Sequence, residues 1–297
     1  MHNGRNIENR LMEDKYMTKG NVITEKLLEK YRTYLASEEK SAATTTKYIR
    51  DIRKFKDYVD GRSITKEIVA RYKEDLRVNK RYKLSSINSF LIAINSFFSY
   101  MGWHNLRVKT YKVQKELFTP AGRDLSRQEY KKLVYAAKRK GNKRLAMIIQ
   151  TICATGMRVS ELSSVTADSV KKGVVDIYCK GKHRQVLLPG KLRKMLLVYI
   201  SGNKIKGIVF CTSSGKAVDR SNIWREMKEL GNESGVDLEK IFPHNLRHLF
   251  AKVFYETNRD IARLADVLGH SSIETTRLYI MVSCVEHQRQ LDIMGLV

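Results

Sequence analysis

Apolar residues recur at three- and four-residue spacing along residues 21–107, and this periodicity predicts a bundle of short amphipathic helices. The apolar stripes are Leu27, Leu28, Tyr31 and Leu35; Tyr48, Ile52, Phe55 and Val59; Ile68, Tyr72 and Leu76; and Ile87, Leu91, Ile94 and Phe98. Thr24 is placed to cap the first helix, and Gly102 to end the last one. Lysine and arginine occupy much of the opposite faces. We therefore expect the stripes to form a core and the outward basic residues to be the part that contacts a partner.

A second region begins after residues 108–123, where the periodicity fails and turn residues predict a linker. Ser126 can begin a new helix, with Glu129 completing a capping box. An apolar helix over residues 145–154 is expected to end at Gly156. The chain therefore resumes regular structure with a separate set of helices.

This second region also contains a β-hairpin. Residues 174–179 are β-branched and aromatic, residues 185–189 form an apolar partner, and a further short strand is expected at 207–211. We predict a mainly α-helical fold with a small β-hairpin, in which a helical domain precedes an α+β domain. The predicted parts are a disordered leader (1–20), a helical domain (21–107), a linker (108–123) and an α+β domain with a C-terminal tail (124–297).

The charge balance indicates a polyanionic partner. The chain has 56 Lys+Arg against 31 Asp+Glu, a formal net charge of +25. The net charge is +1 over residues 1–20, +10 over 21–120 and +14 over 121–297, so both large regions are basic. Nucleic acid bound by both regions would give a salt-dependent affinity through counterion release. A solvated basic surface and an anionic membrane are the alternatives, and the size and spread of the excess favour nucleic acid.

The cysteine and hydropathy patterns indicate a cytoplasmic protein without membrane contact. The four cysteines form no C-x-x-C pair, which argues against a disulfide framework or a zinc knuckle. No run of about 18 apolar residues exists to span a bilayer. The first 20 residues also lack the apolar segment of a signal peptide.

Three short motifs in the second region carry residues suited to phosphodiester chemistry. They are Ala-Thr-Gly-Met-Arg-Val-Ser-Glu-Leu at 154–162, His-Asn-Leu-Arg-His at 244–248 and Leu-Gly-His at 268–270. Arg158 and Arg247 can each hold two phosphate oxygens with a planar, permanently charged fork. Glu161 follows Arg158 by three residues and can brace it, although an ordinary surface Arg–Glu pair explains that motif equally well.

The histidines and one tyrosine can supply proton transfer and a nucleophile. His244 and Arg247 are three residues apart and share one face of a helix. His270 lies at the turn after a helix end, and Tyr279 lies on the next helix. Since a free tyrosine has a pKa of about 10, Tyr279 needs a base or an electropositive pocket to attack at neutral pH.

A metal site was the alternative for this histidine motif. His244 and His248 have the i, i+4 spacing of zinc ligands, but no neighbouring Asp or Glu completes a zinc motif. We therefore expect neither a metal nor another cofactor, and we expect His248 to be a packing residue.

In this order, the motifs resemble those of the tyrosine recombinases of the phage integrase and Xer family. The resemblance covers nearly the whole chain: the helical region resembles the family's SAM-like core-binding domain, and residues from about 124 resemble its catalytic domain. It places the family's site on Arg158, Glu161, Lys180, His244, Arg247, His270 and Tyr279. Lys182 competes with Lys180 as the lysine of the hairpin turn. Leu249 departs from the pattern, because many members carry Thr there.

The resemblance implies site-specific cutting and rejoining of DNA strands without metal or ATP. Tyr279 would form a 3′-phosphotyrosyl ester while Arg158, Arg247 and His270 stabilise the transition state. Lys180 would protonate the leaving 5′-oxygen, His244 would assist proton transfer and Glu161 would orient the arginines. The resemblance also implies a homo-tetramer on paired sites of double-stranded DNA, with a DNA-bending or excisionase protein as an accessory partner. A type IB topoisomerase-like activity and a non-catalytic DNA-binding regulator on the same scaffold are the rival functions.

Overall fold

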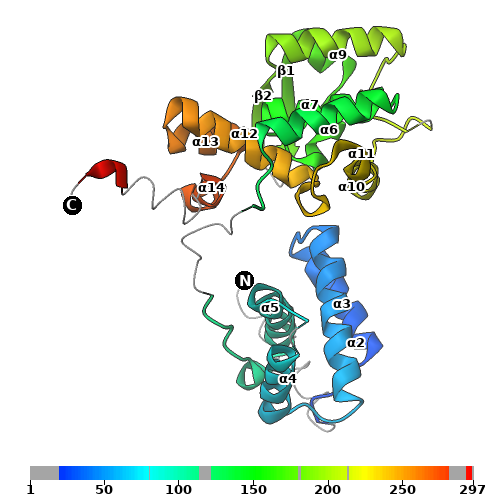
Figure 1. Ribbon diagram of the computed structural model, residues 1–297. Coiled ribbons are helices and arrows are strands. Elements are labelled where there is room, and N and C mark those ends of the chain that lie inside the picture. Colours follow the sequence, from blue (N-terminus) through cyan, green and yellow to red (C-terminus); the bar gives the residue numbers. More distant parts are fainter. Residues whose placement is uncertain are drawn as a thin grey trace, which may run out of the picture. The chain divides into compact units, whose positions relative to one another are not determined.

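The computed structural model describes residues 20–79, 81–113, 122–179, 182–212, 214–280 and 292–295. Over these residues the chain is mainly helical with one antiparallel strand pair, which confirms the fold class predicted from the sequence. The chain divides into two compact units, Met1–Lys115 and Glu116–Val297 (Figure 1). Each unit has its own apolar core, so each is described separately.

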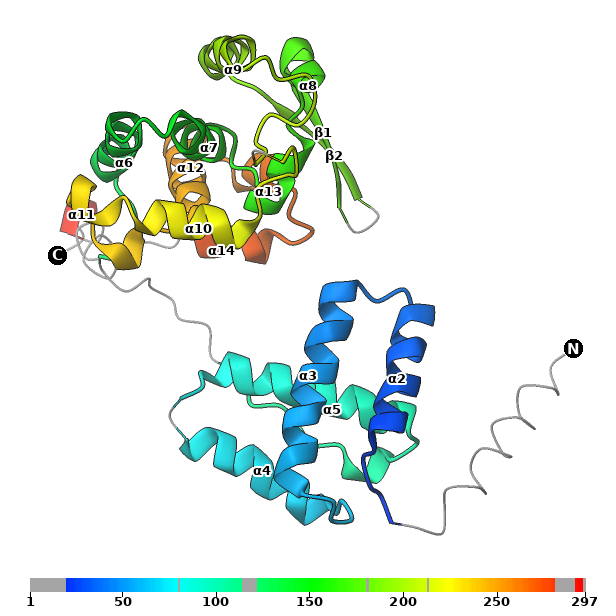
Figure 2. The same ribbon diagram turned by 90° about the vertical axis from the view of Figure 1, so that its right-hand side faces the viewer.

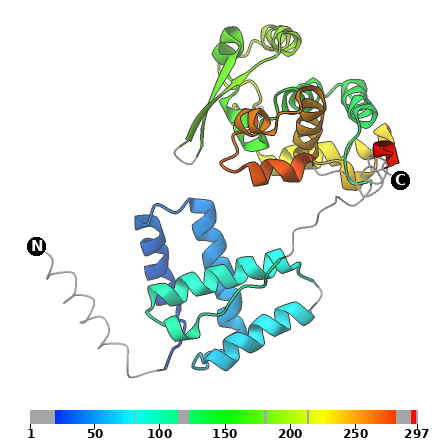
Figure 3. The same cartoon turned by 90° about the vertical axis from the view of Figure 1, so that its left-hand side faces the viewer.

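The first unit is a helical bundle. Its described helices are α2 (Glu25–Ser37), α3 (Ala42–Val59), α4 (Lys66–Val78) and α5 (Leu84–Tyr100), followed by the short 3-10 helix η1 (His104–Leu106). Helices α2 and α3 lie side by side (Figures 2 and 3). As predicted, Thr24 caps α2, because its hydroxyl accepts a hydrogen bond from the backbone N–H of Leu27. The predicted stripes supply most of the core, in which Tyr31 and Phe97 pack edge to face.

The residues that follow η1 are attached to α5. The side chain of Asn95 accepts a hydrogen bond from the backbone N–H of Val108 at 3.0 Å. Asn88 bonds both backbone groups of Tyr111 at 2.8 Å. The predicted linker of residues 108–123 therefore starts with residues that belong to the first unit, while 114–121 lie outside the described residues.

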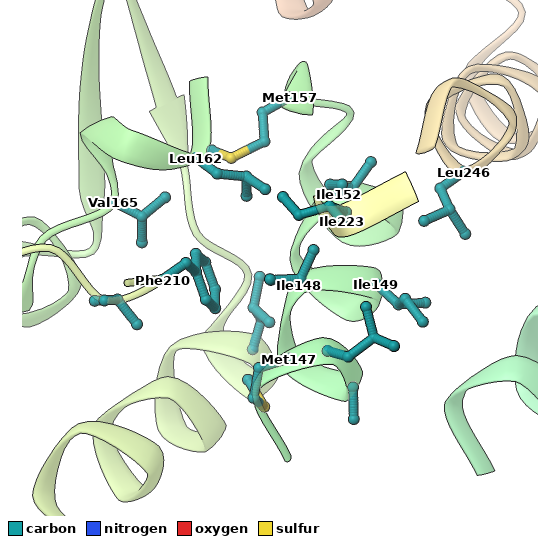
Figure 4. Packing of buried hydrophobic residues seen from close by; sticks show 14 of the residues in the cluster. Met147, Ile148, Ile149, Ile152, Met157, Leu162, Val165, Phe210, Ile223 and Leu246 are labelled. Atoms are coloured by element: carbon teal, nitrogen blue, oxygen red, sulfur yellow. The ribbon is translucent and has the colours of Figure 1, made fainter. Parts of the chain in front are cut away.

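The second unit surrounds a buried helix. Its described elements are α6 (Arg127–Arg139), α7 (Lys143–Thr155), η2 (Val159–Ser164), α8 (Ala167–Lys172), β1 (Val174–Cys179), β2 (Lys182–Leu187), α9 (Gly190–Gly202), α10 (Arg220–Lys228), α11 (Gly231–Ser234), η3 (Leu238–Lys240), α12 (Pro243–Asn258), α13 (Ile261–Leu268) and α14 (Ile273–Ile280). Helix α7 contributes buried residues on all sides, including Met147, Ile148, Ile149 and Ile152 (Figure 4). This buried helix packs against α6, α9, α10 and α12, so the motif at its own end and the motif on α12 share one support.

The hairpin is the long, narrow element of this unit (Figure 2). Strands β1 and β2 pair in antiparallel register, with Ile177 opposite Arg184 and Tyr178 opposite His183. The expected short strand at 207–211 is wrong: Ile208 and Cys211 form only isolated bridges, to Thr166 and Ala217. Val209 and Phe210 are nevertheless buried, so the apolar run packs into the core without forming a strand.

No helix in the described part of the chain has both the length and the apolarity to cross a membrane.

Candidate active site

The end of α7 fixes the first predicted arginine. Gly156 ends the helix in the left-handed conformation, with φ of 66°. A Cβ at this position would lie 2.4 Å from a ring carbon of Phe250, so both conformation and space favour glycine. Arg158 then starts η2, and its backbone N–H donates to the Glu161 carboxylate at 2.6 Å. The motif at 154–162 is therefore a helix end followed by a side-chain-capped turn.

Glu161 joins two arginines. Its carboxylate is 4% exposed and lies 3.0 Å from Nη1 of Arg158 and 2.7 Å from Nη2 of Arg184. Arg184 also donates to the carbonyl of Val267 at 2.7 Å. Because the Arg158 side chain is still 39% exposed, it can bind a further anion. Glu161 thus contacts Arg158 as the sequence predicted, and it also contacts Arg184, which the sequence did not predict.

Arg247 is the most buried charged group of the site. It is 1% exposed and donates to the carbonyls of Gly156 at 2.5 Å and Leu268 at 2.8 Å. Its Nε is buried without a hydrogen-bond partner. Burial, reinforced by the charge of Arg158, lowers the pKa of Arg247 to about 10, so the group is still a cation at neutral pH. A buried cation with an unused donor favours an incoming anion.

His270 lies beside Arg247 at the turn that follows α13. Gly269 ends α13 with φ of 63°, and a Cβ there would lie 2.4 Å from Cδ of Arg184. The Nε2 atom of His270 is 2.8 Å from Nη2 of Arg247, and its Nδ1 is 2.8 Å from the hydroxyl of Thr276. Burial and the neighbouring Arg247 lower the pKa of His270 to about 4, which makes the DNA-free form neutral at pH 7.

Tyr279 reaches the same group of residues from α14. Its hydroxyl is 3.2 Å from Nε2 of His244, and its ring stacks on His248 with centroids 4.2 Å apart. The Arg247 guanidinium carbon lies 5.8 Å from the Tyr279 ring centroid, and the His270 ring lies 5.2 Å from it. Tyr279 is therefore surrounded by one cation and three imidazoles, and its hydroxyl is hydrogen-bonded to one of these, His244.

His244 faces this hydroxyl from the first turn of α12. Pro243 occupies the first helical position and so leaves no backbone donor unpaired there. Burial, together with His248 and Arg247, lowers the pKa of His244 to about 4. A neutral imidazole with Nε2 toward a tyrosine hydroxyl can accept its proton.

The structure brings together Arg158, Glu161, His244, Arg247, His270 and Tyr279, which are all of the predicted residues except the hairpin lysine. Lys180 lies outside the described residues, as does the side chain of Lys182. Strand β1 ends at Cys179 and β2 begins at Lys182, so Lys180 falls between the two strands in the sequence.

Three further residues of the site were missed. Arg184 had a detectable signal: it shares a strand face with buried Val186, two positions on, and an arginine on an apolar face needs a buried partner. Thr276 precedes Tyr279 by three residues and therefore lies on the same face of α14. His248 was expected to pack, and it does pack, but against the candidate nucleophile.

Comparison with known proteins identifies the family. Residues 123–284 match the model of the phage integrase family, and residues 28–105 match the phage integrase N-terminal SAM-like domain. The tyrosine recombinase XerA of Pyrococcus furiosus is 30% identical over 271 residues, which cover 88% of this chain and 91% of the relative. The tyrosine recombinase XerD of Vibrio cholerae is 30% identical over 227 residues, covering 71% and 75%.

Solved structures share the fold. XerH recombinase bound to its difH substrate superposes with a TM-score of 0.66 at 22% identity, covering 90% of this chain and 84% of that one. A lambda integrase dimer bound to a core site gives a TM-score of 0.70 at 16% identity, covering 86% and 95%. Since one family model spans more than half of the chain and XerA matches it almost end to end, the chain belongs to the phage integrase family and is a site-specific tyrosine recombinase.

Proposed function

We propose that this recombinase cuts and rejoins DNA through a 3′-phosphotyrosyl ester on Tyr279. The observation that carries the proposal is the position of the Tyr279 hydroxyl, 3.2 Å from Nε2 of His244 and beside buried Arg247. In the cleavage step the phenolic oxygen bonds to phosphorus as the bond to the 5′-oxygen breaks. In the rejoining step a 5′-hydroxyl attacks that ester and releases the tyrosine. Bond energy is kept in the ester, so the chemistry needs neither ATP nor metal.

His244 is proposed to take the proton from Tyr279. Its lowered pKa keeps the imidazole neutral at pH 7, and its Nε2 is within hydrogen-bond range of the hydroxyl. The proton returns by the same route when the ester is broken. The ring of His248 stacks on the Tyr279 ring and so helps to keep the Tyr279 hydroxyl next to His244.

Arg247, Arg158 and His270 are proposed to hold the scissile phosphate. Arg247 has an unused buried donor, and Arg158 has an exposed fork beside it. Fixed cations of this kind act mainly where charge develops in the transition state. Glu161 then acts as a supporting residue, because it orients Arg158 and binds Arg184 rather than the phosphate.

Lys180 is proposed to protonate the leaving 5′-oxygen, with Lys182 as the other candidate. Their place at the end of a long hairpin supports this, since a side chain there can approach DNA after it binds. The reverse reaction uses the same group as a base, because the attacking 5′-hydroxyl must lose that proton.

The assembly is proposed to be a homo-tetramer on paired DNA sites, with an accessory DNA-bending or excisionase protein. Residues 282–297, most of which lie outside the described residues, are proposed as the contact with a neighbouring protomer. The family membership supports this, and a lambda integrase of the same fold has been solved as a tetramer bound to a Holliday junction. The net charge of +25 supports double-stranded DNA as the partner of both units. Residues 21–107 are proposed to form a core-binding domain, to which Val108 and Tyr111 are attached by Asn95 and Asn88, and residues 124–297 are proposed to form a catalytic domain.

A suicide substrate tests the nucleophile. The DNA is a duplex that is selected from a random-sequence library by its binding to the full chain. A nick is then placed near the cleavage site, so that cleavage releases a short fragment that diffuses away and cannot be rejoined. The wild type should form a covalent adduct, and Tyr279→Phe should bind this DNA equally well without forming one. Tyr255→Phe is the matched control, because Tyr255 lies in the same apolar cluster on α12 and should keep full adduct formation. An adduct that persists in Tyr279→Phe would assign the nucleophile to another residue.

A further inference from the structure

The hydrogen bonds of His270 determine where its proton lies. Arginine has only donors, so Nη2 of Arg247, 2.8 Å away, must donate to Nε2 of His270. A nitrogen that accepts carries no proton in a neutral imidazole. The single ring proton is therefore on Nδ1, and Nδ1 donates it to the hydroxyl of Thr276 at 2.8 Å.

Thr276 is well placed for this purpose. It is fully buried, with an exposed fraction of 0%, and it is the buried residue of α14, while its neighbour Thr275 is exposed. Thr276 lies three residues before Tyr279, so the hydroxyl that holds His270 and the candidate nucleophile share one helix face. A valine has the same shape but would leave the Nδ1 proton buried without an acceptor.

We propose that Thr276 is a positioning residue that fixes the tautomer of His270 and joins the Tyr279 helix to the phosphate site. With Nδ1 committed to Thr276, Nε2 orients the guanidinium of Arg247 before DNA binds. A second proton can be added only at Nε2, so an arriving phosphate anion that charges His270 creates a new donor next to Arg247. The hydroxyl of Thr276 accepts from Nδ1 in both the neutral and the charged form.

The role of His270 and Tyr279 in cleavage is part of the proposed function, so the test reads the tautomer directly. The full-length DNA-free chain, labelled with ¹⁵N in its histidines, is studied by NMR near neutral pH. The His270 signals are those that disappear in His270→Gln. We expect a protonated Nδ1 and a bare Nε2 in the wild type, in Thr276→Ser and in Thr275→Val. Thr276→Val should lose this pattern.

Cleavage of the suicide substrate gives the second readout. Thr276→Val should cleave about tenfold more slowly at saturating DNA, whereas Thr276→Ser and Thr275→Val should stay close to the wild type. A protonated Nε2 in the wild type, or an unchanged tautomer in Thr276→Val, would overturn the inference. An equal loss in Thr276→Ser would also overturn it, since the methyl group and not the hydroxyl would then matter. If Tyr279→Phe still formed an adduct, only the proposed function would fail, and the NMR result would stand.

Discussion

The arginine pocket and the tyrosine helix meet at one site but are held in different ways. Arg247 is 1% exposed and is tied to two backbone carbonyls, and Glu161 is 4% exposed between two arginines. Helix α14 has a single buried residue, Thr276, and presents Tyr279 through ring contacts and one hydrogen bond. The electrostatic part of the site is therefore built into the core, while the proposed nucleophile lies on the surface of that core.

This difference fits the order of events in cleavage. A pocket that must stabilise charge in the transition state gains from being rigid before the substrate arrives. In the proposed function, Tyr279 would become bonded to DNA and later be released, and such a residue has to tolerate movement. We expect variants of the buried pocket residues, Arg247 and Glu161, to affect both folding and chemistry, and a variant of the exposed or half-buried residues of α14, such as Tyr279, to affect mainly chemistry.

The largest expected effect is the loss of cleavage in variants of the two arginines, which should differ from each other in stability. Arg247→Ala and Arg158→Ala should each slow cleavage by about a thousandfold at saturating DNA, with DNA affinity changed only a few-fold, because many other cations share the contact with the backbone. Arg247→Ala should also lower the unfolding temperature, since it removes a buried group that binds Gly156 and Leu268, whereas Arg158→Ala should not.

Arg127→Ala is the control for this pair, because Arg127 is a 63% exposed arginine of the same unit. Single-turnover cleavage, fluorescence anisotropy with labelled DNA and thermal unfolding give the three readouts. If affinity fell as far as cleavage did, both arginines would be docking residues.

The hairpin lysine should show the next largest effect. Lys180→Ala should cleave ordinary DNA about a hundredfold or more slowly, because a general acid is lost. A substrate with a 5′-bridging sulfur should be cleaved nearly as fast as by the wild type, since a thiolate leaves without a proton. Rescue of Lys182→Ala instead would move the acid to Lys182, and rescue of neither would make the hairpin a DNA anchor only.

Substitution of Arg184, which connects the arginine pocket to the turn before the tyrosine helix, should give a smaller loss of cleavage. Arg184 connects β2 to Glu161 and to the end of α13, close to His270. Arg184→Gln should slow cleavage by about tenfold, because it loosens both Arg158 and the His270 turn. Arg193→Gln is the matched control: Arg193 also donates to a backbone carbonyl, that of Val170, but away from the site. Thermal unfolding of both variants measures their loss of stability, and equal cleavage by both would show that Arg184 is only structural.

Local signals explain what the sequence predicted correctly. Thr24, Ser126 and Gly156 act within one helical turn of their own position, so helix ends could be placed without a structure. The motif residues could be proposed as a site because they occur in one order along the chain, and their catalytic roles stay predictions. The short strand at 207–211 failed because strand formation depends on a partner elsewhere in the chain.

The missed residues depend on contacts between segments. Arg184 meets Glu161 across 23 residues, and nothing in the hairpin alone shows which carboxylate it will find. His248 follows His244 by one helical turn, but its stacking partner Tyr279 arrives from another helix. Sequence patterns identified which residue types the site needs, while tertiary packing determined which neighbours orient them.

The smallest predicted effect concerns pH and stability. His270 faces Arg247, Arg158, Arg184 and His244, and its pKa is lowered to about 4 in the folded chain, compared with about 6.5 when unfolded. The unfolded chain therefore binds more protons between these values, so stability is fully present above pH 6.5 and falls as the pH falls toward 4. His244, which faces His248, Arg247, Arg220 and Arg158, has a pKa lowered to about 4 and acts in the same direction.

Trp224 can report this effect in the second unit alone. The chain has two tryptophans, and Trp103→Phe leaves Trp224 as the only one. Urea unfolding of this variant, followed by fluorescence from pH 7 down to pH 4.5, should show a falling free energy of unfolding. His270→Gln should reduce the slope by at most about 1.4 kcal/mol per pH unit, the value for one proton. His104→Gln, in the first unit, should leave it unchanged. An unaltered slope in His270→Gln would mean that His270 does not titrate differently in the two states, and the neutral imidazole beside Arg247 would have to be abandoned.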